Sequence, residues 1–260
     1  MTWTIAFLLM GSGLLVGFIN TLAGGGSVIS LSLFMFLGMP PAMANGTNRI
    51  PILFQTLTSS VYYIKHKMVD VKKALSLGVF LGIGSVLGAL FAVGVEQIIF
   101  ERAIGLVLFL MMLMMIFKPQ LWENGSPKLL AKKLNWKTVL VFLAIGFYGG
   151  FIYVGLGYLL LAALVGMIGF DLIKATALKN VLVFIFIPFT LIVFMWNGNV
   201  NYAYGFVHAI GNVIGAFFAS RLSVHKGVGF MRWLMIIILA IFTVHYSGLF
   251  DLRTLFDFKL

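Results

Sequence analysis

The sequence predicts an all-α polytopic membrane protein built from two inverted repeats, each a re-entrant or broken helical hairpin followed by three transmembrane helices. Its composition, the length of two apolar runs and the placement of positive charges support this fold. Of the 260 residues, 62% are hydrophobic and 10% are charged, and the mean hydropathy is +1.09. A soluble domain carries about a quarter charged residues, whereas apolar runs of about 18 or more residues are typical of transmembrane helices.

Apolar segments follow one another along the whole chain. They are expected at 3–22, 26–38, 42–64, 74–95, 99–117, 138–153, 157–169, 172–196, 202–221 and 229–246. The first two form one run, as do 138–153 and 157–169. A continuous helix of about 36 residues would be about 54 Å long, against a hydrocarbon core of about 30 Å. Each run must therefore turn back on itself, and glycines place the turns at Gly24–Gly26 and at Val154–Gly157.

The positive charges predict the orientation. If each long run is a hairpin, four of the 18 basic residues (Arg49, Arg102, Arg253 and Lys259) lie on one side, and the other 14 lie on the opposite side. The richer side is cytoplasmic by the positive-inside rule. Both termini are then extracytoplasmic, and the two halves, with three full crossings each, are inverted relative to one another.

Internal similarity supports the repeat. At a shift of 131, glycine and alanine positions of the first hairpin fall on those of the second, and at a shift of 127 residues 84–92 match 211–219 at six of nine positions. The alternative is that Gly/Ala-rich helices resemble each other by composition. The expected organisation is a first repeat at 1–117 (hairpin 3–38 plus three spans), a basic cytoplasmic linker at 118–137, a second repeat at 138–246 (hairpin 138–169 plus three spans) and a tail at 247–260.

The hairpin tips suggest an anion site. Gly25, Gly26 and Ser27 precede one apolar helix, and Gly155 and Gly157 precede another. A helix N-terminus favours anions because its free N–H groups and its dipole act together, and glycine lets a ligand approach the backbone closely. Close helix packing through glycine is the alternative explanation.

Two cations inside apolar segments point the same way. Arg49 and Lys179 each lie beside an asparagine, Asn48 and Asn180, at matching positions of the two repeats. A charge within a membrane helix is costly and indicates function, although a long side chain near a helix end can also reach the headgroups. All seven acidic residues lie in loops, at segment ends or in the tail. Because no carboxylate is expected beside these cations, the ligand is predicted to be an anion.

Other polar side chains could complete this site. They are Asn20 and Thr21 beside the first tip, Gln55 after Arg49, Tyr153 and Tyr158 beside the second tip, and His208 and Asn212 within the span 202–221. His208 is expected either to join two helices by a hydrogen bond or to carry a proton. The chain lacks metal-ligand spacing, a P-loop and a nucleophile elbow, so we expect no enzyme activity, no metal and no cofactor. The expected partners are a small anion and membrane lipid; no nucleic acid is expected, and a homo-oligomer is left open.

The stretch GFINTLAGGGSVISLSLFMFLGMPPAMANGTN (17–48) resembles the first-repeat pattern of the TauE/SafE family of sulfite and organosulfonate exporters, also called the toluene sulfonate uptake permease family. The pattern is a Gly-rich break, an apolar stretch, a Gly-x-Pro turn and a small-residue Gly-Thr helix start. A weaker copy at 146–180 has VGLGY in place of the glycine triplet and lacks the proline turn. The resemblance implies a multi-pass permease of the bacterial plasma (inner) membrane for small sulfur-containing or carboxylated anions, with no enzyme activity and no bound cofactor.

The predicted function is a secondary transporter, favoured as an exporter, of anions such as sulfite, sulfoacetate or other sulfonates. Alternating access would occur around a site at the membrane midplane. Three alternatives stay open: an anion channel on the same fold, a polytopic enzyme acting on lipid, and a structural membrane subunit. Because an inside-negative potential already drives anion export, we expect uncoupled or weakly coupled export rather than obligatory symport.

Overall fold

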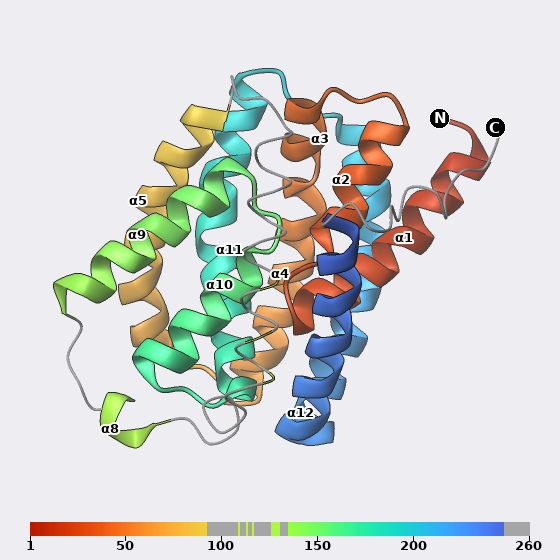
Figure 1. Ribbon diagram of the computed structural model, residues 1–260. Coiled ribbons are helices and arrows are strands. Elements are labelled where there is room, and N and C mark those ends of the chain that lie inside the picture. The colour runs from red at the N-terminus through yellow and green to blue at the C-terminus, as the bar shows by residue number, and fades with distance from the viewer. Residues whose placement is uncertain (93–108, 110–112, 114–115, 117–125, 131–134, 247–260) are drawn as a thin grey trace.

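The computed structural model describes residues 1–92, 109, 113, 116, 126–130 and 135–246, and the secondary structure of this part of the chain is helical (Figure 1). The helices are α1 (Trp3–Leu22), α2 (Ser27–Phe36), α3 (Pro41–Thr47), α4 (Arg49–Lys65), α5 (Val71–Phe91), α8 (Pro127–Leu130), α9 (Trp136–Phe151), α10 (Leu156–Ala163), the π-helical turn η2 (Leu164–Ile168), α11 (Leu172–Trp196) and α12 (Tyr202–Tyr246). By length and composition, α1, α5, α11 and the Tyr202–Val224 part of α12 can each cross a membrane. The protein is therefore a polytopic, all-helical membrane protein.

Short polar side chains define several helix starts. Asp70, Asn135 and Asp171 each accept a hydrogen bond from the backbone N–H three residues ahead, at 3.1, 2.8 and 2.9 Å. These are N-cap interactions, which satisfy a donor that the first turn of a helix leaves free. They fix where α5, α9 and α11 begin.

The predicted hairpin turns are confirmed. The first run breaks between Leu22 and Ser27, and the second between Phe151 and Leu156. Gly24 and Gly155 adopt positive φ values of +93° and +71° at these breaks, a conformation that glycine reaches without steric cost. Glycine therefore provides the reversal at each tip.

Two predicted segment boundaries differ from the structure. The expected span 42–64 is divided into α3 and α4 at Asn48, because Pro51 has no N–H to bond the carbonyl of Thr47. The expected spans 202–221 and 229–246 lie in one helix, α12. No proline lies within α12 to end the helix. Nearly all of the predicted span 99–117, most of the linker 118–137 and the whole tail 247–260 lie outside the described residues.

The helices form two bundles that do not coincide with the sequence halves. In the first bundle, α1 packs along α12 and α12 packs against α4, with α2 and α3 attached. In the second bundle, α9 packs along α5 and α5 packs against α11, with α10 and η2 attached. Figure 1 shows the first bundle on the right and the second on the left, meeting where α4 lies against α11. Each bundle thus contains the hairpin of one half and a long helix of the other.

Glycines make the tightest contacts inside both bundles. Gly13 and Gly17 of α1 face His208 and Asn212 of α12, and Gly146 and Gly150 of α9 face Leu81 and Ser85 of α5. At all four glycines an added Cβ would lie within 2.4 Å of a backbone oxygen. The residue numbers of the two glycine pairs differ by 133, and those of their partners differ by 127. The same backbone-to-backbone packing therefore occurs once in each bundle.

Candidate functional site

The tips of the two hairpins touch through their backbones. A Cβ built on Gly24 would lie 2.3 Å from the Cα of Gly157. Both tips are buried in the protein interior. The candidate site residues at the ends of α1, α2, α9 and α10 are therefore brought to one place, where the first bundle meets the second.

Arg49, the first residue of α4, reaches across to the end of α9. Its Nη1 donates to the carbonyl of Gly149 at 2.7 Å, and its Nη2 donates to the carbonyl of Gly150 at 2.9 Å. The last carbonyls of a helix have no partner within the helix and carry its partial negative charge. The guanidinium is thus a C-terminal cap for a broken helix of the other bundle.

Asn45 completes this arrangement from one helical turn earlier. Its Oδ1 accepts from Arg49 Nη2 at 3.1 Å, and its Nδ2 donates to the carbonyl of Phe151 at 2.8 Å. The rings of Tyr153 and Phe194 lie 5.3 and 5.2 Å from the guanidinium carbon, within the range of cation–π attraction. Arg49 and Asn45 together are called the Arg49 clamp below.

Lys179 makes the reciprocal contact from α11 to the end of α1. Its Nζ donates to the carbonyls of Asn20 and Thr21 at 2.8 and 2.9 Å. Asn180 Nδ2 also donates to the Thr21 carbonyl at 2.9 Å, while Ser59 of α4 donates to Asn180 Oδ1 at 3.1 Å. Lys179 and Asn180 together are called the Lys179 clamp. Each clamp thus combines a cation and an amide that cap the broken helix of the opposite hairpin.

Both cations are held inside the protein. Arg49 is 0% and Lys179 2% exposed, so the alternative that they extend to lipid headgroups is wrong. Among the described residues, the ion pair that forms is between Lys174 and Asp171 at the start of α11, and it includes neither Arg49 nor Lys179. Neither Asp70 nor Asp171, the two acidic residues that the structure describes, pairs with Arg49 or Lys179. Backbone carbonyls partly balance the two charges.

Several buried polar atoms near the clamps have no protein partner within the described residues. They include the Oδ1 and Nδ2 of Asn48, the Nε of Arg49, the Oγ1 of Thr21 and the hydroxyl of Tyr158. Lys179 uses two of its three donors on carbonyls. A buried polar group without a partner costs about 1–3 kcal/mol, so these groups are available to bind a polar ligand.

The first tip is partly closed by its own side chains. Asn20 Oδ1 accepts from the backbone N–H of Ser27 at 3.2 Å, and Asn20 Nδ2 donates to Ser27 Oγ at 3.1 Å and to Gln55 Oε1 at 3.5 Å. The N–H of Ser27, expected to face an anion, is therefore occupied. The hydrogen bonds of the described residues leave the N–H groups of Gly25 and Gly26 free of an acceptor.

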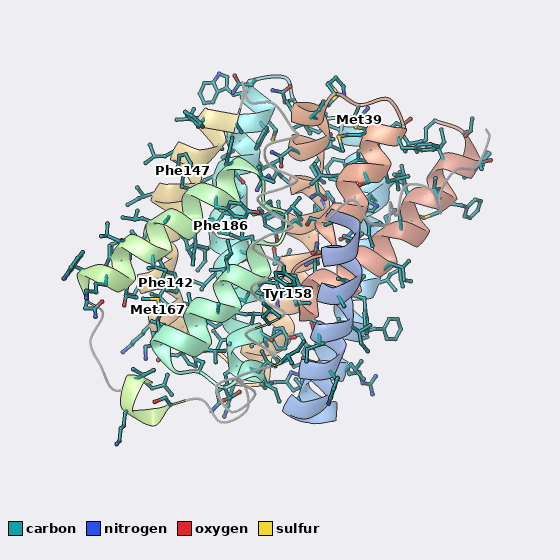
Figure 2. All side chains as sticks on the ribbon, viewed as in Figure 1. Met39, Phe142, Phe147, Tyr158, Met167 and Phe186 are labelled. Atoms are coloured by element: carbon teal, nitrogen blue, oxygen red, sulfur yellow. The ribbon has the colours of Figure 1, made fainter. Side chains whose placement is uncertain are left out.

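The second tip differs in chemistry. Tyr153 and Tyr158 stand there in place of a compact amide and hydroxyl, and Figure 2 shows Tyr158 in the middle of the molecule. Tyr153 has a φ of +72°, which is uncommon for a residue other than glycine and indicates local backbone strain. Its ring nevertheless contacts Arg49. Gly155 provides the turn and Gly157 the contact with the first tip.

His208 and Asn212 belong to a separate polar cluster. His208 Nδ1 donates to the carbonyl of Leu9 at 2.8 Å, and its Nε2 lies 2.9 Å from Ser30 Oγ. Asn212 Nδ2 donates to the carbonyl of His208 at 3.0 Å. In the described part of the chain no hydrogen bond joins either side chain to a clamp. His208 therefore makes helix-to-helix hydrogen bonds, the first of the two roles expected for it.

Sequence reasoning missed Asn45 and Ser59 as members of the site. Asn45 could have been found, because it lies four residues before Arg49 and so on the same face of a helical stretch. The carbonyls of Gly149 and Gly150 could not have been found, because every residue has a backbone carbonyl.

Comparison with known proteins identifies the family of the chain. Residues 9–246 match the family described as "Sulfite exporter TauE/SafE". The chain belongs to the TauE/SafE family. This TauE/SafE chain is 30% identical over 225 residues to a "Probable membrane transporter protein" of Haemophilus influenzae, covering 86% of this chain and 88% of that protein.

Two further relatives of the TauE/SafE chain come from other bacteria. It is 29% identical over 231 residues to "Probable membrane transporter protein YfcA" of Escherichia coli K12, with 88% of this chain and 84% of the relative covered. It is 26% identical over 234 residues to "Probable membrane transporter protein YunE" of Bacillus subtilis, with 81% and 84% covered. No solved structure matches the chain. Because these relatives are named as transporters and not as enzymes, the chain is a membrane transporter of the TauE/SafE family.

Proposed function

We propose that this transporter exports small sulfur-containing or organic anions, such as sulfite, sulfoacetate or other sulfonates, across the bacterial plasma membrane. One observation carries the proposal. Two buried cations, Arg49 and Lys179, lie where the hairpin tips meet, and no carboxylate pairs with either of them in the described part of the chain. Buried charges are normally paired, and an anion from outside would provide the missing negative charge. The family description, "Sulfite exporter TauE/SafE", supports this substrate class.

The proposed site uses the donors that the protein leaves free. Arg49 Nε, the remaining N–H of Lys179 and the amide of Asn48 would bind the anion's oxygens. The backbone N–H groups near Gly25, Gly26, Gly155 and Gly157 would add to the positive potential, as at other helix N-termini. Asn20, Ser27, Gln55, Tyr153 and Asn180 would shape the site and orient the cations. His208 would stay outside it as a tie between α12 and the first hairpin, and Asn212 donates within α12 to the carbonyl of His208.

We also propose that the two halves are inverted repeats, with both termini extracytoplasmic and the site at the membrane midplane. The matched glycine contacts support a repeat, since their two sets are offset by constant shifts of 133 and 127. The reciprocal clamps support it as well, because each half caps the hairpin of the other. Inverted repeats with broken helices and a midplane site are common in secondary transporters.

Alternating access is favoured over an open channel by the contact between Gly24 and Gly157. The tips touch through their backbones at this point, whereas a channel would need a continuous path past them. A lipid-acting enzyme is disfavoured by the names of the relatives. Export is expected to need no coupling ion, since an inside-negative potential favours anion exit by about 2.3 kcal/mol per charge per 100 mV.

Flux into and out of proteoliposomes tests this function. Vesicles loaded with sulfoacetate, sulfite or acetate should release the accepted anion at a rate that saturates with concentration and follows a clamped potential. Taurine is the matched control, because its ammonium group cancels the charge of its sulfonate. Anion flux no faster than in protein-free vesicles would contradict the proposal, and non-saturating current would favour the channel. Uphill accumulation driven by a proton or sodium gradient would overturn uncoupled export.

A further inference from the structure

We propose that the bodies that move during transport are the two bundles and not the two sequence halves. The two clamps hold these bundles together until an anion replaces the carbonyls as the hydrogen-bond partner of Arg49 and Lys179. The inference rests on the proposed function, because it assumes that an anion reaches Arg49 and Lys179. It goes further in naming the moving parts and the contacts that an anion breaks.

Each bundle has the internal contacts expected of a rigid body. The glycine faces of α1 and α9 place their backbones directly against α12 and α5, and backbones in direct contact leave little freedom to slide because packed interiors transmit strain. Within the first bundle, His208 joins α12 to both arms of the hairpin, and Tyr63 of α4 bonds Ser223 of α12 at 2.8 Å. Within the second, Gly78 of α5 lies against Ile185 of α11, where an added Cβ would lie 2.9 Å from the Cδ1 of Ile185.

The interface between the bundles is formed largely by α11 lying against α4, together with the contact of the tips. Both clamps cross this interface in opposite directions. Arg49 and Asn45 of the first bundle hold the end of α9, while Lys179 and Asn180 of the second hold the end of α1. Separating the tips by moving one bundle against the other therefore requires these hydrogen bonds to break.

An anion can replace the carbonyls that the clamps now bind. Hydrogen bonds in which both partners are charged are shorter and stronger than those to a neutral carbonyl. An oxyanion that has reached the free donors of Arg49 and Lys179 thus competes with the carbonyls for the remaining ones. Transfer of the cations to the anion releases the helix ends and permits the bundles to rock apart on one side.

The two cations differ in their surroundings. Counting Asn45 and Asn180, each clamp makes three hydrogen bonds to carbonyls of the opposite bundle. Arg49 also lies against two aromatic rings, and no such ring contact holds Lys179 in the described part of the chain. Lys179 is therefore the cation that turns to the anion first, which frees the end of α1 and the first hairpin tip. Asn45 acts as a positioning residue, because it holds the guanidinium and the end of α9 in register.

The absence of cysteine from the sequence makes a distance measurement direct. Pairs of cysteines are introduced at exposed positions and carry spin labels attached through thioethers, because sulfite would cleave a disulfide. The pair Lys65/Lys174 spans the two bundles, Lys65/Arg221 lies within the first, and Lys72/Lys174 lies within the second. Distances between the spin labels are measured by pulsed electron paramagnetic resonance in proteoliposomes with and without sulfoacetate. Flux is measured on the same samples.

The proposal expects sulfoacetate to change the Lys65/Lys174 distance while both distances within bundles stay constant. Lys179→Met is combined with the labelled pair Lys65/Lys174. Without any anion, this variant should show the distance that sulfoacetate produces in the wild type, and added sulfoacetate should not change that distance. Flux accompanied by a constant cross-bundle distance, or by a change within either bundle, would overturn this inference and leave the proposed function standing. Absence of flux would overturn the proposed function itself. The wild-type measurement decides between the first two results even if Lys179→Met does not fold.

Discussion

Gly24 and Gly157 lie so close that neither position has room for a side chain. A Cβ on Gly157 would lie 2.4 Å from the Cα of Gly24, and the reverse distance is 2.3 Å. Real Cβ atoms do not approach other carbon atoms so closely, so the contact exists only because glycine occupies both sites. The closed contact between the hairpin tips is therefore specific to this pair of residues.

Gly157→Ala should prevent the tips from closing. Unlike Gly24, Gly157 does not have a positive φ, so the substitution tests the contact without adding backbone strain. We expect sulfoacetate flux to fall at least tenfold, measured in proteoliposomes with matched protein content. Gly11→Ala is the control, because a Cβ there meets nothing within 4 Å. Flux equal to that of the wild type would mean that the tips need not touch.

Arg49→Lys keeps the charge but loses the planar pair of donors that binds Gly149 and Gly150. Leaving a buried carbonyl without its donor costs about 1–3 kcal/mol, and an ammonium does not reproduce bidentate binding. We expect a melting temperature several degrees lower and a weaker stabilisation by sulfoacetate, both measured by thermal shift on purified protein. The exposed Arg221→Lys should change neither quantity. An unchanged melting temperature would show that the guanidinium does not hold the end of α9.

Asn45→Asp would place a carboxylate directly on Arg49, where Asn45 Oδ1 now accepts from Nη2 at 3.1 Å. This internal anion would balance the guanidinium, and it would also repel an incoming anion. The protein should stay folded but lose most of the thermal shift produced by sulfoacetate. Asn197→Asp, on an exposed side chain, is the isosteric control. A wild-type thermal shift in Asn45→Asp would place the anion site away from Arg49.

His208→Gln should affect stability more than transport. The ring bonds Leu9 and Ser30 through its two nitrogens and packs edge-on against Phe34 at 5.2 Å, so the loss of one hydrogen bond should cost about 1 kcal/mol. We expect a lower melting temperature and a flux that keeps the same dependence on pH between about 6 and 8 as the wild type. The exposed His66→Gln serves as the control. A pH profile altered only in His208→Gln would make this histidine a proton carrier.

Local chemistry made much of the fold predictable from the sequence. The two long apolar runs had to reverse, and the glycines at 24 and 155 gave the positions that the structure confirms. Burial of Arg49 and Lys179 was likewise expected from their place in apolar segments. In contrast, the sequence did not reveal that Asn48 ends a helix, because the effect of Pro51 on the preceding turn competes with the helical preference of the whole segment.

The partners of the two cations could not be predicted. Their acceptors are backbone carbonyls, which have no sequence code, and they become available only because α1 and α9 end inside the protein. The exchange of hairpins between bundles was also hidden. The sequence indicates which faces carry glycine, but both α5 and α12 offer such a face to both α1 and α9. Only the three-dimensional arrangement distinguishes the two pairings.

The pairing of α1 with α12 has a consequence for biogenesis. The ribosome delivers α1 first and α12 last, so the glycine face at Gly13 and Gly17 has no partner helix until more than 200 residues have been made. During that interval the newly synthesised hairpin stays in the bilayer or beside an insertion factor, and the polar groups of its tip lack hydrogen-bond partners. A chain truncated before α12 should therefore be a substrate for membrane quality-control proteases. Co-expressing the two halves as separate polypeptides can restore the protein only if each half survives long enough to complete the other's bundle.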